Sequence, residues 1–348
     1  MKKCFRQICF FVFCGIIACN ISKADEPKIS TEQTPNVVSE KRVQELKNLR
    51  WGMFICWSFS TFSGKEWTTN VATRTDYDKL FPATNVDTDQ WAKTAKEAKM
   101  GYILFLTKHH DGFCLWDTKT TERKITNAPL GKDVLAELKK SCDKYGIKLA
   151  LYFSEGDWTW KGAVDGKVYC GGNNPEVKKA QLKELLTNYG PIEYIWFDHA
   201  AGTGGLNHNE TTEWCKKLQP NCFIGYNHGD QSTADIRLGE MGKPGSLDDN
   251  SSTPWNKVKD NKHNWKVAEF TYPILPAHSG GAMWFYSLPK HDKLVYPATK
   301  LFDDYLGAVK YGNIFSINVG PDYNGKIRDI DVKILQEVGQ KIQELEKK

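Results

Sequence analysis

Residues 133–154 read DVLAELKKSCDKYGIKLALYFS, and this stretch decides the fold class. The segment 133–146 reads as a helix and stops at a glycine, the residue that commonly follows a helix C-terminus. Residues 148–154 continue almost at once as an apolar run, which is typical of a strand buried on both faces. A helix that leads directly into such a strand predicts one unit of a parallel sheet covered by helices.

The same alternation extends in both directions from this unit. Further strands are expected at residues 51–59, 102–107, 193–198, 222–227, 267–271 and 313–320. Further helices are expected at residues 88–99, 175–190, 211–219, 297–312 and 330–348. This number of units fits a closed (β/α)8 TIM-like barrel better than an open doubly wound sheet. The chain also lacks the G-x-G-x-x-G, P-loop and G-x-S-x-G motifs of other α/β folds.

Residues 228–264 form the longest stretch that we expect to be irregular. A loop of this length inside a compact domain is usually functional or disordered. Because it follows the end of an expected strand, we expect it to lie over the active-site face of the barrel.

The N-terminus reads as an export signal. A basic head precedes an apolar run at residues 8–19, which is too short to anchor the chain in a bilayer. Residues 22–24 (SKA) fit the small-x-small cleavage pattern, so we predict a signal peptide over residues 1–24 and a periplasmic or extracellular protein. Residues 16–19 also fit a lipoprotein box, in which the signal ends before Cys19 and that residue carries a lipid anchor.

The rest of the chain divides into a short tether and one domain. Residues 25–44 are polar and contain proline, and we expect them to be a tether to a catalytic barrel over residues 45–348. No second long apolar segment follows, so no transmembrane segment is expected. Nothing in the sequence defines an oligomeric state.

The charge of the mature chain argues against nucleic acid as a partner. Residues 1–24 hold four basic residues and no acidic one, so their removal takes the net charge from +5 to +1. No basic run occurs elsewhere. Six cysteines remain after the signal, without a C-x-x-C pair, which argues against a zinc ribbon.

Polar and aromatic residues gather at the expected strand ends. Active sites of such barrels lie at the carboxyl ends of the strands, so these side chains are expected to converge on one pocket. The candidates from this pattern are Glu66, Trp67, His109, His110, Tyr152, Trp196, Asp198 and Glu269.

Enzymatic hydrolysis of a glycosidic bond usually requires a pair of carboxyl groups, one on each side of the bond. Asp198 ends an apolar strand and is the candidate nucleophile, although an Asp at this place can also cap a helix. Glu269 lies between Ala268 and Phe270. Such an apolar setting raises the pKa of a carboxyl group, which suits a general acid, although a buried Glu can also pair with a basic residue.

His109 and His110 have an ordinary interpretation as polar packing. Neighbouring residues of a strand point to opposite faces, so we expect the pair to be a poor metal chelate. No metal and no cofactor are predicted.

Several motifs together resemble glycoside hydrolase family 29, the α-L-fucosidases. Residues 107–116 (TKHHDGFCLW) resemble the family stretch T-K-H-H-(D/E)-G-F-x-L-W, and residues 318–325 (NVGPDYNG) resemble N-V-G-P-x-x-x-G. The remaining matches are WGMFI at 51–55, the Glu66-Trp67 pair, WFD at 196–198, and VAE at 267–269 with WFY at 284–286. The last pattern is closest to the branch that acts on α-1,3/1,4-linked fucose.

The resemblance implies an exo-acting, retaining hydrolase that releases terminal α-L-fucose from fucosylated oligosaccharides or glycoconjugates. It implies that Asp198 is the nucleophile and Glu269 the acid/base. The residues that it implies for sugar binding are Glu66, Trp67, His109, His110, Tyr152, Trp196, Trp284 and Cys56.

Three departures from the family pattern keep more than one interpretation open. Cys56 stands where the family has a sugar-binding His, so one alternative is a related glycosidase for another sugar, such as an α-L-galactosidase. The chain ends where the family commonly adds a β-sandwich, so we expect a single catalytic domain without it. The acid/base is the least uniform position, and Glu240 is the reserve candidate. Two further interpretations are a non-catalytic sugar-binding homologue and a metal-dependent hydrolase that uses His109, His110 and Asp198.

Overall fold

The structure is a computed structural model, which describes residues 38–198, 202–250 and 263–348. The predicted signal peptide at 1–24 and most of the predicted tether lie outside these described residues. Residues 36–348 form one compact unit. Within the described ranges, no helix combines the length and apolar character needed to cross a bilayer.

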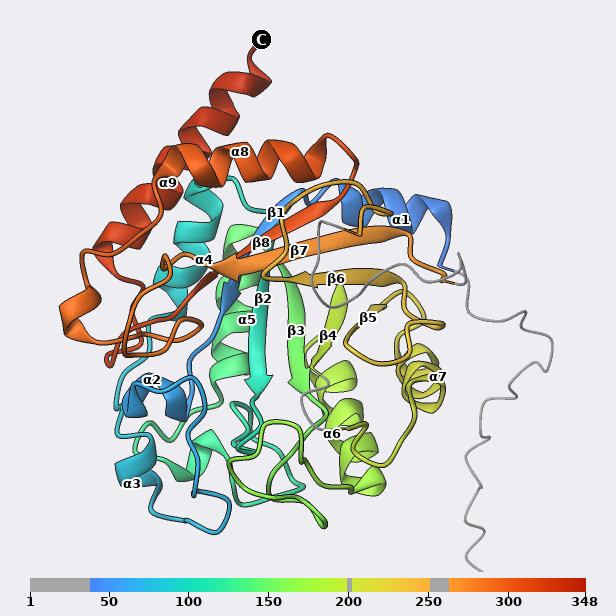
Figure 1. Cartoon of the computed structure of the whole chain (residues 1–348), viewed down its shortest axis with the longest axis vertical. Helices are drawn as coiled ribbons and strands as arrows, with labels where there is room; N and C mark the ends of the chain where they lie inside the picture. Colours follow the sequence, from blue (N-terminus) through green and yellow to red (C-terminus); the bar gives the residue numbers. More distant parts are fainter. Residues whose placement is uncertain (1–37, 199–201, 251–262) are drawn as a thin grey trace, which may run out of the picture. The chain divides into compact units, whose positions relative to one another are not determined.

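Eight parallel strands close into a barrel, in which each strand pairs with its neighbours along the chain and the last pairs with the first (Figure 1). The strands are β1 Trp51–Ile55, β2 Tyr102–Lys108, β3 Lys148–Ser154, β4 Tyr194–Asp198, β5 Phe223–Asn227, β6 Ile236–Glu240, β7 Val267–Pro273 and β8 Ile314–Val319. Nearly all of their residues are buried, as the continuous apolar runs require. The (β/α)8 prediction is confirmed.

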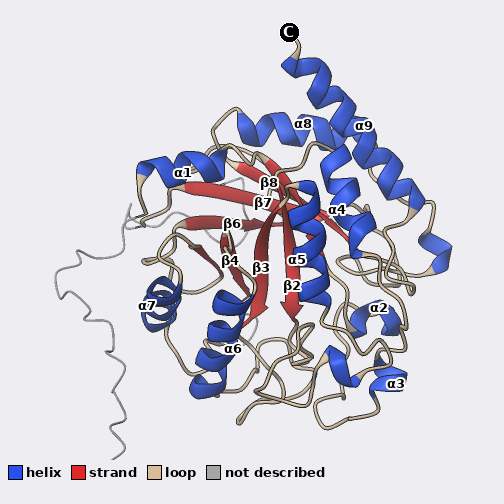
Figure 2. Ribbon diagram, turned by 180° about the vertical axis from the view of Figure 1, so that it is seen from behind, coloured by secondary structure: helices blue, strands red, loops and turns tan. Residues whose placement is uncertain are grey.

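Helices surround the strands on the outside of the barrel (Figure 2). They are α1 Glu40–Lys47, α2 Phe59–Ser63, α3 Tyr77–Leu80, α4 Thr88–Glu97, α5 Val134–Tyr145, α6 Pro175–Asn188, α7 His208–Leu218, α8 Ala298–Val309 and α9 Asp329–Glu346. The stop at Gly146 has the expected cause, because this residue adopts a left-handed φ of 69° that favours glycine.

The structure corrects two boundaries. Strand β6 lies inside residues 228–264, which were expected to be irregular throughout, and it pairs with both β5 and β7. Helix α1 begins inside the segment 25–44 that was expected to be a tether. The side chain of Ser39 accepts a hydrogen bond from the backbone of Arg42, and Val43 is buried against the core.

A layer of polar and aromatic side chains fills the inside of the barrel. Tyr102, Tyr194 and Ser316 come from three strands, and their hydroxyls meet, with 2.7 Å between the oxygens of Tyr102 and Ser316. Gly52 leaves the space for this layer, because a Cβ there would lie 2.5 Å from the Tyr102 ring. All of these side chains are buried, so the layer closes the barrel below the carboxyl ends of the strands.

Candidate active site

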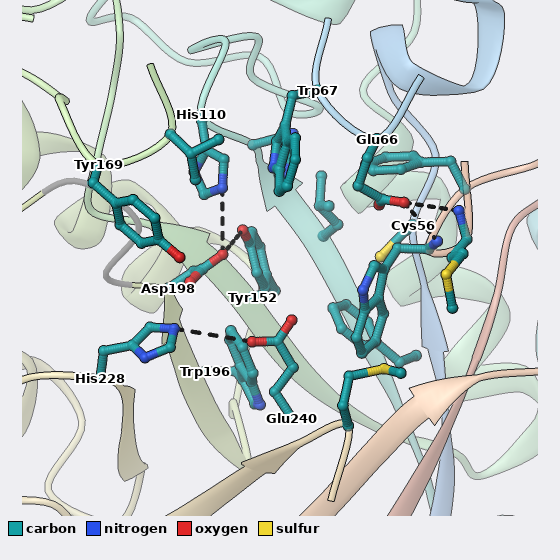
Figure 3. A pocket seen from close by; sticks show the side chains of 18 residues that line it. Cys56, Glu66, Trp67, His110, Tyr152, Tyr169, Trp196, Asp198, His228 and Glu240 are labelled. Carbon is teal, nitrogen blue, oxygen red and sulfur yellow. Dashed lines mark hydrogen bonds and ion pairs between the residues drawn. The ribbon is translucent and has the colours of Figure 1, made fainter. Parts of the chain in front are cut away.

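A pocket of about 340 Å³ opens at the carboxyl ends of the barrel strands (Figure 3). Its lining comes from β1, β2, β3, β4 and β6 and from the loops that follow the strands. The lining residues are Phe54, Cys56, Glu66, Trp67, Leu106, His109, His110, Tyr152, Val168, Tyr169, Trp196, Asp198, His228, Glu240, Met241, Met283, Trp284 and Phe285. Of the residues named from the sequence as site candidates, only Glu269 does not line it.

Asp198 is the last residue of β4, and its carboxylate is held from three sides. The Tyr152 hydroxyl donates to Oδ2 over 2.6 Å, and the Nε2 atom of His110 lies 3.5 Å from the same oxygen. The side-chain amide of Asn227 donates to Oδ1 over 3.5 Å. Both Tyr152 and His110 point at Asp198 in Figure 3. These contacts fix the direction of the carboxylate before any ligand binds.

His109 and His110 both line the pocket, which corrects the expectation that they point to opposite faces. Strand β2 ends at Lys108, so the two histidines follow the strand rather than alternate within it, and their ring centres lie 4.1 Å apart. Burial lowers the pKa of His109 well below its ordinary value and lowers that of His110 to about 3. Both rings are therefore neutral and can exchange hydrogen bonds with sugar hydroxyls.

Aromatic rings form one wall of the pocket. The rings of Tyr152 and Trp196 stack with 5.3 Å between centres and 22° between planes. The ring of Phe54 packs against both of these rings, with 5.7 and 6.2 Å between centres, and against Trp284 at 5.8 Å. Such a wall suits the apolar face of a sugar ring. Trp67 is 42% exposed and lies at the rim.

Glu66 and Cys56 line the side of the pocket that faces the loop after β7. Backbone N–H groups of Met283 and Trp284 donate to Glu66, over 2.7 and 3.4 Å. Burial raises the pKa of Glu66 and, more strongly, the pKa of the Cys56 thiol. Cys56 therefore presents a neutral thiol, a weak hydrogen-bond donor, to the ligand.

Glu240 lines the pocket together with Asp198 and Glu66. It is the last residue of β6, and the amide of Asn227 donates to its Oε2 over 2.7 Å. The Nε2 atom of His228 lies 4.0 Å from the same oxygen. Burial, together with the charge of Asp198, raises the pKa of Glu240 to about 7. Glu240, which was only the reserve candidate from the sequence, therefore lines the same pocket as Asp198 and shares the amide of Asn227 with it.

Glu269 lies deeper in the barrel. It is fully buried and does not line the pocket, and its Oε2 accepts a hydrogen bond from the indole N–H of Trp196 over 3.3 Å. In the register of β6 and β7, Glu269 is level with Leu238 and Thr271 is level with Glu240. Burial raises the pKa of Glu269 to about 7, as its apolar neighbours in the sequence indicated.

Sequence reasoning missed several pocket residues, among them His228, Met241 and Tyr169. His228 and Met241 follow β5 and β6, and they adopt left-handed φ values of 74° and 52°, a strained conformation that is common at functional sites. Tyr169 is 74% exposed, and its hydroxyl points toward Asp198 (Figure 3). Only His228 had a usable signal, since it follows the predicted strand 222–227.

No group of three or more His, Cys, Asp or Glu side chains among the described residues is arranged to hold a metal ion. The described cysteines are free thiols, and all but Cys170 are buried.

The model of the family described as "Alpha-L-fucosidase" matches residues 17–345, which is almost the whole chain. The chain belongs to the α-L-fucosidase family. The motifs that indicated this family at 107–116 and 196–198 contribute His109, His110, Trp196 and Asp198 to the pocket.

Fucosidases of known sequence and structure resemble the chain along most of its length. Alpha-L-fucosidase 1 of Arabidopsis thaliana is 29% identical over 84% of this chain and 58% of its own length. An alpha-L-fucosidase of Dictyostelium discoideum is 26% identical, over 76% and 56%. The chain thus spans less than two-thirds of the length of these curated relatives.

Solved structures of the family share the barrel. Alpha-L-fucosidase isoenzyme 1 from Paenibacillus thiaminolyticus superposes with a TM-score of 0.70 at 27% identity, over 87% of this chain and 76% of its own. A glycoside hydrolase 29 family member from an unknown rumen bacterium gives 0.69 at 29% identity, over 88% and 57%.

Proposed function

We propose that this protein is an exo-acting, retaining glycoside hydrolase that releases terminal α-L-fucose from glycans. One observation carries the proposal: Asp198 and Glu240 lie in the same pocket, with the amide of Asn227 between them. The pocket is closed below by the layer around Tyr102, so it suits a single terminal sugar rather than a chain that passes through.

The spacing of the two carboxyl groups favours retention. One nitrogen, Nδ2 of Asn227, lies 3.5 Å from an oxygen of Asp198 and 2.7 Å from an oxygen of Glu240. These two oxygens can be no farther apart than the sum of the two distances. That sum is below the ~6.5–9.5 Å separation of inverting enzymes, which leave room for a water molecule.

In the first step, Asp198 attacks the anomeric carbon of the sugar and forms a covalent ester with it. The bond between that carbon and the glycosidic oxygen breaks, and Glu240 gives its proton to this oxygen. In the second step, water attacks the same carbon, Glu240 takes the proton from the water, and the bond to Asp198 breaks. Two inversions leave the configuration unchanged.

The environments of the two carboxyl groups suit these opposite roles. A nucleophile must be ionised, and the hydrogen bond from Tyr152 and the nearby His110 stabilise the Asp198 carboxylate. An acid must keep its proton near neutral pH, and burial raises the pKa of Glu240 to about 7. Because Glu240 lines the pocket and Glu269 does not, we assign the acid/base role to Glu240, and to Glu269 a supporting role as the hydrogen-bond acceptor of the Trp196 indole.

One specific observation supports an alternative to fucose as the sugar that the enzyme releases. Cys56 lines the pocket with a small, neutral thiol, where a bulkier hydrogen-bonding side chain would leave less room. A sugar that differs from fucose by an added hydroxyl at C6, L-galactose, is the alternative substrate.

We also propose that the enzyme is exported and acts on glycans outside the cytoplasm, because residues 1–24 have the pattern of a signal peptide. Mass spectrometry of the protein from its native host tests this. A mature chain that begins at Asp25 supports a soluble protein, an acylated Cys19 supports a lipoprotein, and an intact Met1 would overturn export.

The central test is turnover of α-L-fucosides by the mature protein and by Asp198→Ala. We expect the wild type to release fucose from a nitrophenyl α-L-fucoside or a fucosylated oligosaccharide, with the α-anomer formed first in the NMR spectrum. A 2-deoxy-2-fluoro-α-L-fucosyl fluoride should label Asp198. Hydrolysis of the matching L-galactoside alone would select the alternative glycone. Binding of fucose without turnover of any glycoside would show a sugar-binding homologue.

A further inference from the structure

The connection that follows β7, residues 274–297, holds one carboxyl group of the pocket in place. It brings Met283 and Trp284 to the pocket wall. The backbone N–H groups of these two residues donate to Glu66 over 2.7 and 3.4 Å. The position of the Glu66 carboxyl group therefore depends on the shape of this connection.

Three side chains, His278, Ser287 and His291, join the two ends of the turn that carries Met283 and Trp284. We call them the clasp. The Nε2 atom of His278 lies 3.1 Å from the Ser287 oxygen, and the Nδ1 atom of His291 lies 2.7 Å from the same oxygen. Ser287 is buried, and a Cβ at Gly281 would lie only 1.9 Å from its oxygen. The turn is therefore wrapped tightly around one hydroxyl group.

The clasp also adjoins the segment that contains Glu66. Gly64 lies two residues before Glu66, and a Cβ there would lie 2.9 Å from the Leu288 side chain and 3.4 Å from the backbone oxygen of Ser287. Burial raises the pKa of Glu66, whereas the backbone hydrogen bonds from the turn and the charge of His278 act in the opposite direction. A change in the clasp therefore reaches Glu66 through packing, hydrogen bonds and charge.

The hydrogen bonds of the clasp can be kept in two protonation states. The Nδ1 atom of His278 lies 2.8 Å from the carbonyl oxygen of Pro276, which can only accept, so this nitrogen carries a hydrogen. When both rings are neutral, Ser287 donates to Nε2 of His278 and accepts from Nδ1 of His291. When His278 takes up one proton, its Nε2 donates to Ser287, and Ser287 donates to Nδ1 of His291. Only the direction of the two bonds changes.

A second proton breaks this arrangement. With both rings protonated, both nitrogens donate to Ser287, and the hydroxyl hydrogen has no acceptor within the clasp. Two positive rings would also lie with their centres 4.2 Å apart. Burial and the charge of His278 lower the pKa of His291, so His291 stays neutral while His278 carries the proton. The other charged groups around the pair are Glu66 on the pocket side, and Lys290, Arg328 and Asp292 around His291.

We propose that Ser287 is a positioning residue for sugar binding, which holds Glu66 in place through the clasp when the clasp carries no proton or one, but not two. This inference rests on the proposed function, in which Glu66 binds the sugar. Ser287 and the two histidines do not line the pocket, so they act through Glu66 and do not touch the reacting atoms.

The first test removes the bridging hydroxyl with Ser287→Ala. At pH 7 we expect the KM for an α-L-fucoside and the Kd of L-fucose, measured by calorimetry, to rise about tenfold, while kcat stays within about threefold, because Glu66 contacts a part of the sugar that does not react. Ser287→Cys keeps a weaker donor and acceptor and should recover part of the affinity. Ser279→Ala is the matched control, since Ser279 is exposed on the same turn and does not line the pocket. Unchanged affinity in Ser287→Ala, or an equal loss in Ser279→Ala, would overturn the proposal.

The second test uses pH and does not depend on the folding of Ser287→Ala. In His291→Asn, the side-chain amide can still donate to or accept from Ser287 but cannot be protonated, so L-fucose should bind at pH 7 within about twofold of the wild type. As the pH falls below about 6.5, the ordinary pKa of histidine, the affinity of the wild type should decline through the lowered pKa of His291. His291→Asn should keep its affinity. The same decline in both proteins would overturn the proposal. If the wild type neither binds L-fucose nor hydrolyses any α-L-fucoside, the proposed function itself fails, and this inference fails with it.

Discussion

Glu240 and Glu269 belong to neighbouring strands, and burial raises the pKa of both carboxyl groups to about 7. They differ in depth. Glu240 ends β6 and lines the pocket, whereas Glu269 lies two residues before Thr271, the β7 residue that is level with Glu240. Since a strand rises about 3.3 Å per residue, this offset places Glu269 one layer below the pocket.

The comparison teaches that a raised pKa alone does not identify an acid catalyst. Perturbed groups are good candidates for function, but burial in a structural network has the same effect on the pKa. What separates the two residues is access: Glu240 lines the pocket (Figure 3), whereas Glu269 is fully buried and accepts a hydrogen bond from the indole N–H of Trp196.

The largest expected effect is on catalysis of a substrate with a poor leaving group. Glu240→Gln keeps the shape of the side chain but cannot donate the proton, so kcat/KM for 3-fucosyllactose should fall by about 10²–10⁴-fold. Glu269→Gln should change it by less than about tenfold. Steady-state kinetics of both variants check this. A loss in Glu269→Gln as large as that in Glu240→Gln would reverse the assignment.

A substrate with a different leaving group separates the roles of Glu240 and Glu269 further. Fluoride leaves without a proton from the enzyme, so the defect of Glu240→Gln should shrink by about tenfold or more when α-L-fucosyl fluoride replaces the trisaccharide. Whatever small defect Glu269→Gln has should be the same for both substrates. An equal defect of Glu240→Gln on both would mean that this residue binds the sugar without donating a proton.

The pH profile gives a smaller but specific difference. The acid must be protonated in the free enzyme, so kcat/KM of the wild type should decline as the pH rises through about 7, the raised pKa of Glu240. Glu240→Gln should lose this alkaline limb, and Glu269→Gln should keep it. Persistence of the limb in Glu240→Gln would assign it to another group.

The smallest expected effect is on stability, and it belongs to Glu269. Its pKa is raised from 4.5 to about 7 on folding, so the stabilisation from its protonated form is complete below about pH 4.5 and is lost as the pH rises through 7. The loss is about 3 kcal/mol by pH 8. Glu269→Gln should remove the contribution of Glu269 to this pH dependence, whereas the contribution of Glu240, whose pKa is also raised to about 7, remains. Thermal unfolding of Glu269→Gln at pH 8 should therefore occur a few degrees higher than that of the wild type. Equal melting temperatures of Glu269→Gln and the wild type at pH 8 would contradict the raised pKa of Glu269.

The sequence predicted the parts of the fold that depend on local pattern. Seven strands were expected from their sequences, and each was found. Strand β6 was missed because its sequence, IRLGE, contains Arg237 and ends in Gly-Glu, although it is as long as β1, β4 and β5. The Arg237 side chain is buried, where it donates to backbone oxygens of Leu247 and Asp249 and lies over the Trp265 ring. These partners exist only in the folded chain.

The candidate site likewise has residues that local sequence identified and one choice that depended on the folded chain. Asp198 was identified because it ends an apolar strand, and the family motifs marked the histidines and Glu66. The choice between Glu240 and Glu269 depends on the register of two strands, one of which was not recognised. Local sequence indicated correctly that the pKa of Glu269 is raised, but not how deep that residue lies.

The layer formed by Tyr102, Tyr194 and Ser316 leaves the pocket with a single mouth. For the proposed reaction, this single opening fixes the order in which the glycan leaves, water enters and fucose leaves. The departing glycan must clear the mouth before water can reach the bound sugar, and free fucose leaves last by the same route. Such an enzyme cannot slide along a polymer between cuts, so each fucose that it removes requires a separate encounter with the glycan.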